Sequence, residues 1–187
     1  GELGLRAAGD VDLLVKKADV VRAVAAGTRC GLVPPEYEMP LPWLRWTHFH
    51  TKLAPTGDWA CEVEIHWALH HRSLGLTVSQ DELWQRARPV KVGSATARTL
   101  DPLDRFLHVA THLDSHALKP LGHHWPALRD ALLAEPRAAV RLKWYVDVAL
   151  LCERLSVTVE SAEMAARILD WNAAPAMRRV LGIAADL

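Results

Sequence analysis

The chain has 187 residues, half of them hydrophobic, and its 22 basic side chains balance its 22 acidic ones. A chain of this length can bury a hydrophobic core, and its balanced charge gives no general attraction to nucleic acid or to an anionic membrane. No apolar run approaches the roughly 20 residues that span a bilayer, and the first residues lack the layout of a signal peptide. Three widely spaced cysteines, odd in number, indicate reduced thiols of a cytoplasmic protein rather than a disulfide or zinc framework.

The first predicted element is a strand that begins with two acids. Asp10 and Asp12 come directly before the apolar residues Leu13–Val15, and we predict Val11–Val15 to be a buried strand. Side chains two residues apart on a strand point to the same face, so the two carboxylates project together. Such a pair suits Mg²⁺, and a third carboxylate from a neighbouring strand would complete a two-metal site for phosphoryl transfer. The competing interpretation is a strand that merely starts with two solvated acids.

The next segments predict a helix and a β-hairpin. Residues Ala18–Ala26 have helical spacing, and Gly27 stands where a helix would end. The proline-rich segment Val33–Pro42 is predicted to be a loop. Residues Trp43–Leu53 then alternate in polarity, and Ala60–Trp67 does so after a turn, which together predict an antiparallel pair of strands.

The second strand of this hairpin carries candidates for the third carboxylate. Glu62, Glu64 and His66 share one face of it, because they are two residues apart. If this strand lies beside the Asp-x-Asp strand, Glu64 or Glu62 reaches the ions that the two aspartates hold. The competing interpretation is a sheet with one face in water, where these side chains only contact solvent.

The second half of the chain is predicted to be mainly helical. A capping box at Ser79–Glu82 starts a helix that runs through Ala87, and a small hairpin surrounds Gly93-Ser94. From Asp101, a predicted N-cap, the remainder has the pattern of four or five helices, and Ala162–Leu181 is predicted to be an amphipathic helix pair that closes the core. These patterns predict an α+β fold: a small mixed or antiparallel sheet flanked by helices, with a helical C-terminal half. We place the α/β core in residues 1–100 and the helical region in residues 101–187.

Three stretches of sequence together resemble a known family: Arg6-x-x-Gly9-Asp10-Val11-Asp12-Leu13-Leu14-Val15, Val63-Glu64-Ile65-His66-Trp67 and Lys143-Trp144-Tyr145-Val146-Asp147. With them, the segment from about Leu5 to about Leu151 resembles the uncharacterised nucleotidyltransferase family. That family belongs to the DNA polymerase β-like nucleotidyltransferase superfamily. The resemblance implies transfer of a nucleoside monophosphate from a nucleoside triphosphate to a small-molecule or carrier-bound acceptor, with Mg²⁺ or Mn²⁺ as cofactor.

The resemblance also implies roles for individual residues. Asp10 and Asp12 match the paired metal ligands and Glu64 the third carboxylate, which makes these three the expected catalytic and metal-binding residues. Arg6 matches a basic residue before the motif, which would meet a phosphate of the substrate. His66 would orient the acceptor or act as a base; the alternative is a packed histidine bonded to backbone.

The superfamily places a strand and a Gly-Ser loop, which holds the triphosphate, before the Asp-x-Asp strand. Nine residues precede Asp10 in this sequence and they lack the serine, so we expect the loop to be missing from it. Either the sequence is a fragment of a longer protein, or the nucleotide is held differently, or the domain is catalytically degenerate. The last possibility defines an alternative function: a binding module that keeps the nucleotidyltransferase fold.

Three histidines offer a second candidate site. His108, His112 and His116 follow one another at four-residue intervals and therefore form a stripe along a helix. If they line the substrate cleft, His112 and His116 contact the phosphate or the acceptor. Two histidines at this spacing also ligate transition metals, so a metal-dependent hydrolase is a further alternative, to which His123 or His124 would add a ligand. The remaining interpretation is a polar stripe packed against the sheet edge or solvent.

Overall fold

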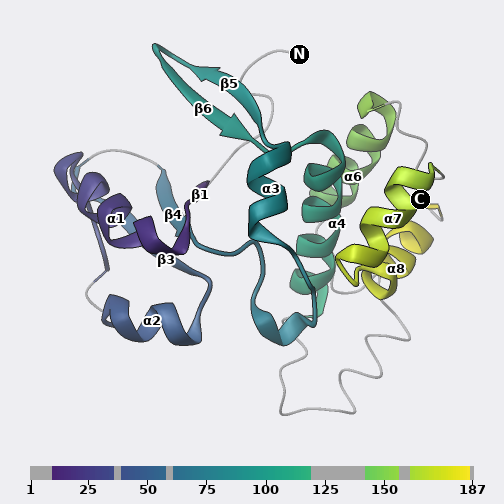
Figure 1. Ribbon diagram of the computed structural model, residues 1–187, viewed down its shortest axis with the longest axis horizontal. Coiled ribbons are helices and arrows are strands. Elements are labelled where there is room, and N and C mark those ends of the chain that lie inside the picture. Colours follow the sequence, from purple (N-terminus) through teal and green to yellow (C-terminus); the bar gives the residue numbers. More distant parts are fainter. Residues whose placement is uncertain (1–9, 36–38, 58–60, 119–141, 156–160, 186–187) are drawn as a thin grey trace. The chain divides into compact units, whose positions relative to one another are not determined.

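The computed structural model describes residues 10–35, 39–57, 61–118, 142–155 and 161–185 (Figure 1). The fold is α+β, as predicted. The chain divides into two compact units, Gly1–Ser73 and Leu74–Leu187, and each is described by itself. The division expected from the sequence lies later, at residue 100, so the units differ from it in where they place one helix and one small hairpin. None of the described helices has the length and apolar character needed to cross a membrane.

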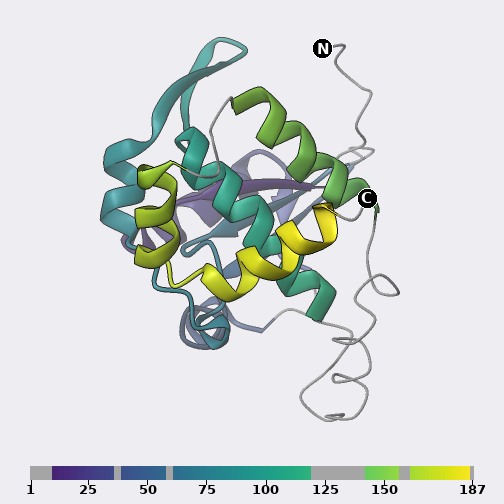
Figure 2. The ribbon, with the colours of Figure 1, turned by 90° about the vertical axis from the view of Figure 1, so that its right-hand side faces the viewer.

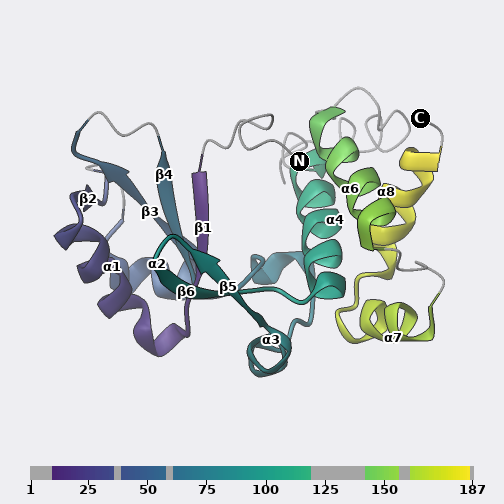
Figure 3. The same ribbon diagram turned by 90° about the horizontal axis from the view of Figure 1, so that it is seen from above.

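The described residues of the first unit form a four-stranded sheet, two α-helices and the short 3-10 turn Lys17–Asp19, and a second such turn, Arg72–Leu74, lies at the boundary with the second unit. The strands lie in the order β1-β4-β3-β2, with β1 parallel to β4 and the other neighbours antiparallel, so the sheet is mixed (Figure 3). In chain order its strands and α-helices are β1 (Asp10–Leu14), α1 (Val20–Arg29), β2 (Leu32–Val33), α2 (Leu41–Thr47), β3 (His50–Pro55) and β4 (Glu62–His66).

The sheet has one apolar and one polar face, which follows from the alternation of its strands. Leu53 of β3 and Ile65 of β4 are buried on the apolar face. Helix α1 lies so close to this face that a Cβ added at Gly27 would stand 2.5 Å from Leu53 Cδ1. The polar face therefore carries His66 and the acids that the sequence analysis selected.

Three details of this unit differ from the sequence prediction. Gly27 does not end helix α1, which continues to Arg29. A Cβ at Gly27 would press on Leu53, so the close packing favours glycine there. Within the described residues of this unit, the glycine with positive φ is Gly31. Strand β1 is not buried, since Val11 and Leu13 are nearly half exposed. The reason is its place at the sheet edge, with β4 as its one neighbour among the described strands.

The third difference lies before β3. Residues 43–47 belong to helix α2, whereas the alternation predicted a strand from Trp43. Two leucines at helical spacing, Leu41 and Leu44, pack with Val20 and Trp67 in a core cluster, and this packing outweighs the alternation. The antiparallel pairing of β3 with β4 confirms the rest of the hairpin.

The second unit contains helices and one small hairpin. In its described residues, the α-helices and strands are α3 (Gln80–Arg86), β5 (Arg88–Val92), β6 (Ala95–Thr99), α4 (Pro102–Leu118), α6 (Leu142–Leu155), α7 (Ala162–Asp170) and α8 (Ala174–Ala185). Helices α6 and α8 both pack on α4 (Figure 2). The predicted Ser79 cap is confirmed, because the Glu82 amide donates to Ser79 Oγ, and Asp101 caps α4 by accepting from the Leu103 amide.

A buried acid joins three helices of this unit. Asp104 of α4 is fully buried and accepts hydrogen bonds from Arg86 of α3 and Arg167 of α7. The two guanidinium groups offset the cost of burying its charge. Packing and these ion pairs therefore account for the burial of Asp104 without a catalytic role.

Candidate functional site

The polar face of the first sheet brings acids from two parallel strands together. The register of β1 against β4 sets Asp10 opposite Glu62 and Asp12 opposite Glu64. Side chains at paired positions of neighbouring strands point to the same face, so four carboxylates occupy adjoining positions on two strands. The sequence predicted the faces of both strands, and the structure adds that they are direct neighbours.

His66 lies between two of these acids. Its Nε2 is 3.1 Å from Glu64 Oε2 and 3.3 Å from Asp12 Oδ1. The imidazole is almost fully buried, whereas the Asp12 side chain is about half exposed. One ring nitrogen thus links the carboxylates that the sequence analysis assigned to a metal.

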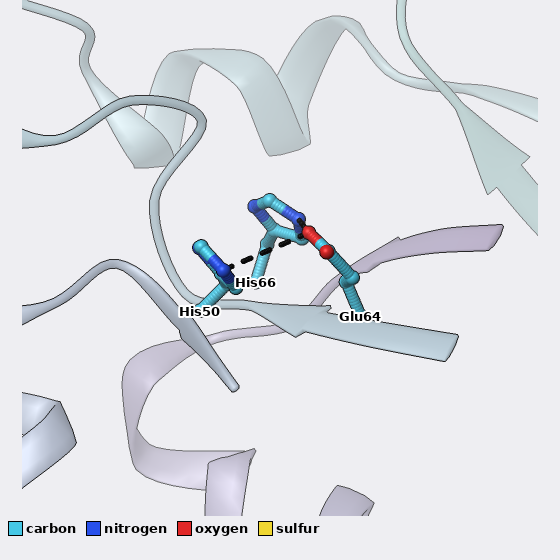
Figure 4. Close-up of side chains that lie close together, drawn as sticks. All are labelled: His50, Glu64 and His66. Carbon is cyan, nitrogen blue, oxygen red and sulfur yellow. Dashed lines mark hydrogen bonds and ion pairs between the residues drawn. The ribbon is translucent and has the colours of Figure 1, made fainter. Parts of the chain in front are cut away.

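Strand β3 supplies two further groups. Lys52 is the register partner of Glu64, and its Nζ lies 2.9 Å from Glu64 Oε1. His50 is the register partner of His66; the two rings stack with centroids 5.0 Å apart, and His50 Nε2 is 3.8 Å from Glu64 Oε2. Figure 4 shows the two imidazoles converging on the carboxylate of Glu64.

The electrostatics of the three central groups follow from these contacts. The hydrogen bond from His66, aided by Lys52 and opposed by burial, lowers the pKa of Glu64 to about 2. Burial alone would lower the pKa of His66, but its bonds to Asp12 and Glu64 outweigh that effect and raise it to about 9. Burial dominates at His50 and lowers its pKa to about 4. At neutral pH, Glu64 and His66 are therefore charged and His50 is not.

The donor set on this face fits a hard divalent cation. Asp10, Asp12 and Glu64 supply carboxylate oxygens, which Mg²⁺ and Mn²⁺ prefer, and half of the Asp12 side chain is open to solvent. Among the described residues, His50, Glu64 and His66 form a second group of potential ligands, and their ligand atoms all lie within 4.8 Å of one another. Asp10 and Asp12 flank that group on the neighbouring strand.

Other residues selected from the sequence lie elsewhere. Arg6 falls outside the described residues. His112 and His116 lie on α4 in the second unit, with His108 before them; successive ring centroids along the stripe are 5.7 and 4.3 Å apart. Eight residues of helix span about 12 Å, so His108 and His116 are too far apart to bind one ion together.

His50 and Lys52 are the residues that sequence reasoning missed. Both residues lie in the alternating segment Trp43–Leu53, whose sequence alone assigns them no partner. The signal that identifies both residues is the hairpin register, which pairs them with His66 and Glu64.

Comparison with known proteins decides the family. A family model described as uncharacterised nucleotidyltransferase matches residues 1–187. The chain belongs to the uncharacterised nucleotidyltransferase family. No curated protein and no solved structure matches it. Membership in this nucleotidyltransferase family supports nucleotidyl transfer as the general chemistry, and the resemblance drawn from the sequence is confirmed.

Proposed function

We propose that this nucleotidyltransferase moves a nucleoside monophosphate from a nucleoside triphosphate to a small-molecule or carrier-bound acceptor on the polar face of its first sheet. The observation that carries the proposal is the parallel pairing of β1 with β4, which sets Asp12 beside Glu64. The two residues are about fifty positions apart in sequence, yet they occupy adjoining positions on one face. Family membership supports the class of reaction.

In this proposal the acids of the two strands hold the divalent ions. Asp10 and Asp12 would bind one Mg²⁺ or Mn²⁺, and Glu64 would share a second with them. Bound ions of this kind neutralise charge on the triphosphate and lower the pKa of an attacking hydroxyl. The carboxylates of Asp10 and Asp12 come from an exposed edge strand, which leaves them accessible to a substrate as large as a nucleotide.

The cationic neighbours of Glu64 have a separate role. Lys52 and the protonated His66 hold the carboxylate of Glu64 from two sides, at 2.9 and 3.1 Å. Both groups also place positive charge on the face that would receive a triphosphate, which favours an anionic substrate. His66 with its raised pKa is a hydrogen-bond donor at neutral pH, so we assign it to positioning rather than to proton abstraction.

The test is release of pyrophosphate by the purified chain. Each of the four ribonucleoside triphosphates is supplied with Mg²⁺ or Mn²⁺ and a cell extract as the pool of acceptors. We expect release that depends on the metal and falls by at least about 100-fold in Asp12→Asn, because a lost metal ligand removes charge stabilisation from the transition state.

The matched control is Asp19→Asn, which removes an acid of the same unit that forms an exposed ion pair with Arg22. Its rate should equal that of the unchanged chain. Metal-dependent binding of nucleotide without any release of pyrophosphate would favour the binding module over the enzyme. Absence of both binding and release would contradict the proposal.

A further inference from the structure

Beyond the Mg²⁺-type site, we propose that His50, Glu64 and His66 form a binding site for a borderline divalent ion of the zinc type. The three ligand atoms come from two neighbouring strands and lie within 4.8 Å of one another. Two imidazole nitrogens and one carboxylate oxygen are a ligand set that suits Zn²⁺, Co²⁺ or Mn²⁺ better than Mg²⁺, which prefers oxygen alone. An ion bound here takes the place of the proton on His66, which is released to solvent.

The distances are close to those that such an ion needs. Ligands about 2.0–2.2 Å from a tetrahedral zinc stand roughly 3.3 Å from each other. Glu64 Oε2 is 3.1 Å from His66 Nε2 and 3.8 Å from His50 Nε2. The third pair, His50 with His66, lies within 4.8 Å, so an inward movement of the His50 ring by as much as about 1.5 Å would bring all three atoms to the required spacing. Water would complete the tetrahedron, as in sites with three protein ligands.

The backbone places the three side chains next to one another on one face of the sheet. His50 and His66 are register partners on antiparallel strands, and Glu64 is two residues from His66 on the same face. All three side chains are at most about one-fifth exposed, so strand geometry and packing restrict their positions (Figure 4). A site built on neighbouring strands is held more firmly than one on loops.

The hydrogen bonds of the fold do not account for His50. Its Nδ1 is buried with no hydrogen-bond partner in the described residues, and its Nε2 stands 3.8 Å from Glu64, beyond hydrogen-bonding distance. A buried polar atom without a partner carries a free-energy cost, so a purely structural residue at this place would be better apolar. Binding of an ion at Nε2 would give this buried imidazole the bonded partner that its 3.8 Å distance from Glu64 leaves it without.

The site shares Glu64 with the proposed function, but it does not depend on catalysis. Its test therefore measures binding alone. Metal-stripped full chain is titrated with Zn²⁺ near neutral pH against a chromogenic chelator. We expect one ion to bind, and the affinity of that ion to fall by at least about 10- to 100-fold in His50→Ala, as weaker perturbations of metal sites already cause such losses.

The control is His48→Ala, which removes an exposed imidazole two positions before His50 whose ring bonds to Thr47. This variant should bind Zn²⁺ as the unchanged chain does. The chain has ten histidines, so the two variants together separate binding at His50 from binding at other histidines. Zn²⁺ binding that is equally tight in His50→Ala would place the ion elsewhere, for example at the α4 stripe, and would overturn the proposal.

A second measurement covers the case in which His50→Ala fails to fold. Co²⁺ added to the unchanged chain should give the visible absorption of a four-coordinate ion with nitrogen and oxygen ligands, and Zn²⁺ should abolish that absorption. The Glu64→Gln variant should lose the same absorption. Failure of the unchanged chain to bind either Zn²⁺ or Co²⁺ would contradict the proposal, whether or not nucleotidyl transfer occurs.

Discussion

At the scale of single residues, the decisive arrangement is one imidazole between two carboxylates. His66 Nε2 contacts both Asp12 and Glu64, and this shared contact raises its pKa to about 9. A protonated His66 thus balances part of the negative charge that the acids place on one face. The same charge makes the stability of the chain depend on pH.

The first prediction concerns that dependence in the presence of a chelator. A histidine with a folded pKa of about 9 contributes stability in full below its unfolded pKa of about 6.5 and loses it as the pH rises through about 9. We expect the free energy of unfolding to fall by on the order of 1–3 kcal/mol between these pH values. Urea unfolding at each pH measures this free energy.

The His66→Gln variant is the comparison for this prediction. It should show a smaller decrease over the same pH interval, because the side chain that titrates is gone. Equal decreases in both proteins would mean that the contacts with Asp12 and Glu64 do not hold a proton on His66.

The residues of the site differ in how far sequence could predict them. The faces of Asp12 and Glu64 follow from two-residue periodicity, which depends only on local sequence. The places of His50 and Lys52 depend on the register between two strands, which packing decides. Asp104 could not be assigned at all, because its two arginine partners come from helices far apart along the chain.

At the scale of elements, predictions that rest on local signals are confirmed, and the mistaken one concerns a segment whose structure depends on packing against distant residues. The caps at Ser79 and Asp101 are local signals, and both are confirmed. The segment from Trp43 alternates like a strand, yet Trp43 and Trp46 are largely exposed on helix α2. What decides this segment is the burial of Leu41 and Leu44 against residues distant in sequence, which alternation cannot reveal.

The second prediction concerns the link between helices in the second unit. Asp104→Asn leaves two arginines facing a neutral amide, with Arg167 itself buried. Removal of one partner from a buried ion pair costs about 3–5 kcal/mol, so we expect a loss of stability of that order. Urea or thermal unfolding of the full chain measures it.

Asp81→Asn is the matched control, since Asp81 is exposed in the first turn of α3. It should change stability by less than about 0.5 kcal/mol. If Asp104→Asn were equally mild, the cluster around Asp104 would not hold α3, α4 and α7 together.

At the scale of the whole molecule, family membership extends over the full chain, while the proposed chemistry rests on one face of one sheet. Two sets of ligands meet there at Glu64: the carboxylates of β1 and the histidines of β3 and β4. The central claim is that a divalent ion binds on this face together with the triphosphate.

Crystals of the chain grown with Mn²⁺ and a non-hydrolysable nucleoside triphosphate test this claim most directly. The anomalous scattering of Mn²⁺ locates the ions independently of the protein. We predict anomalous peaks within coordination distance of Asp10, Asp12 and Glu64, with triphosphate oxygens completing their shells. Bound nucleotide with Mn²⁺ found only away from this face, for instance at the histidines of α4, would contradict the account.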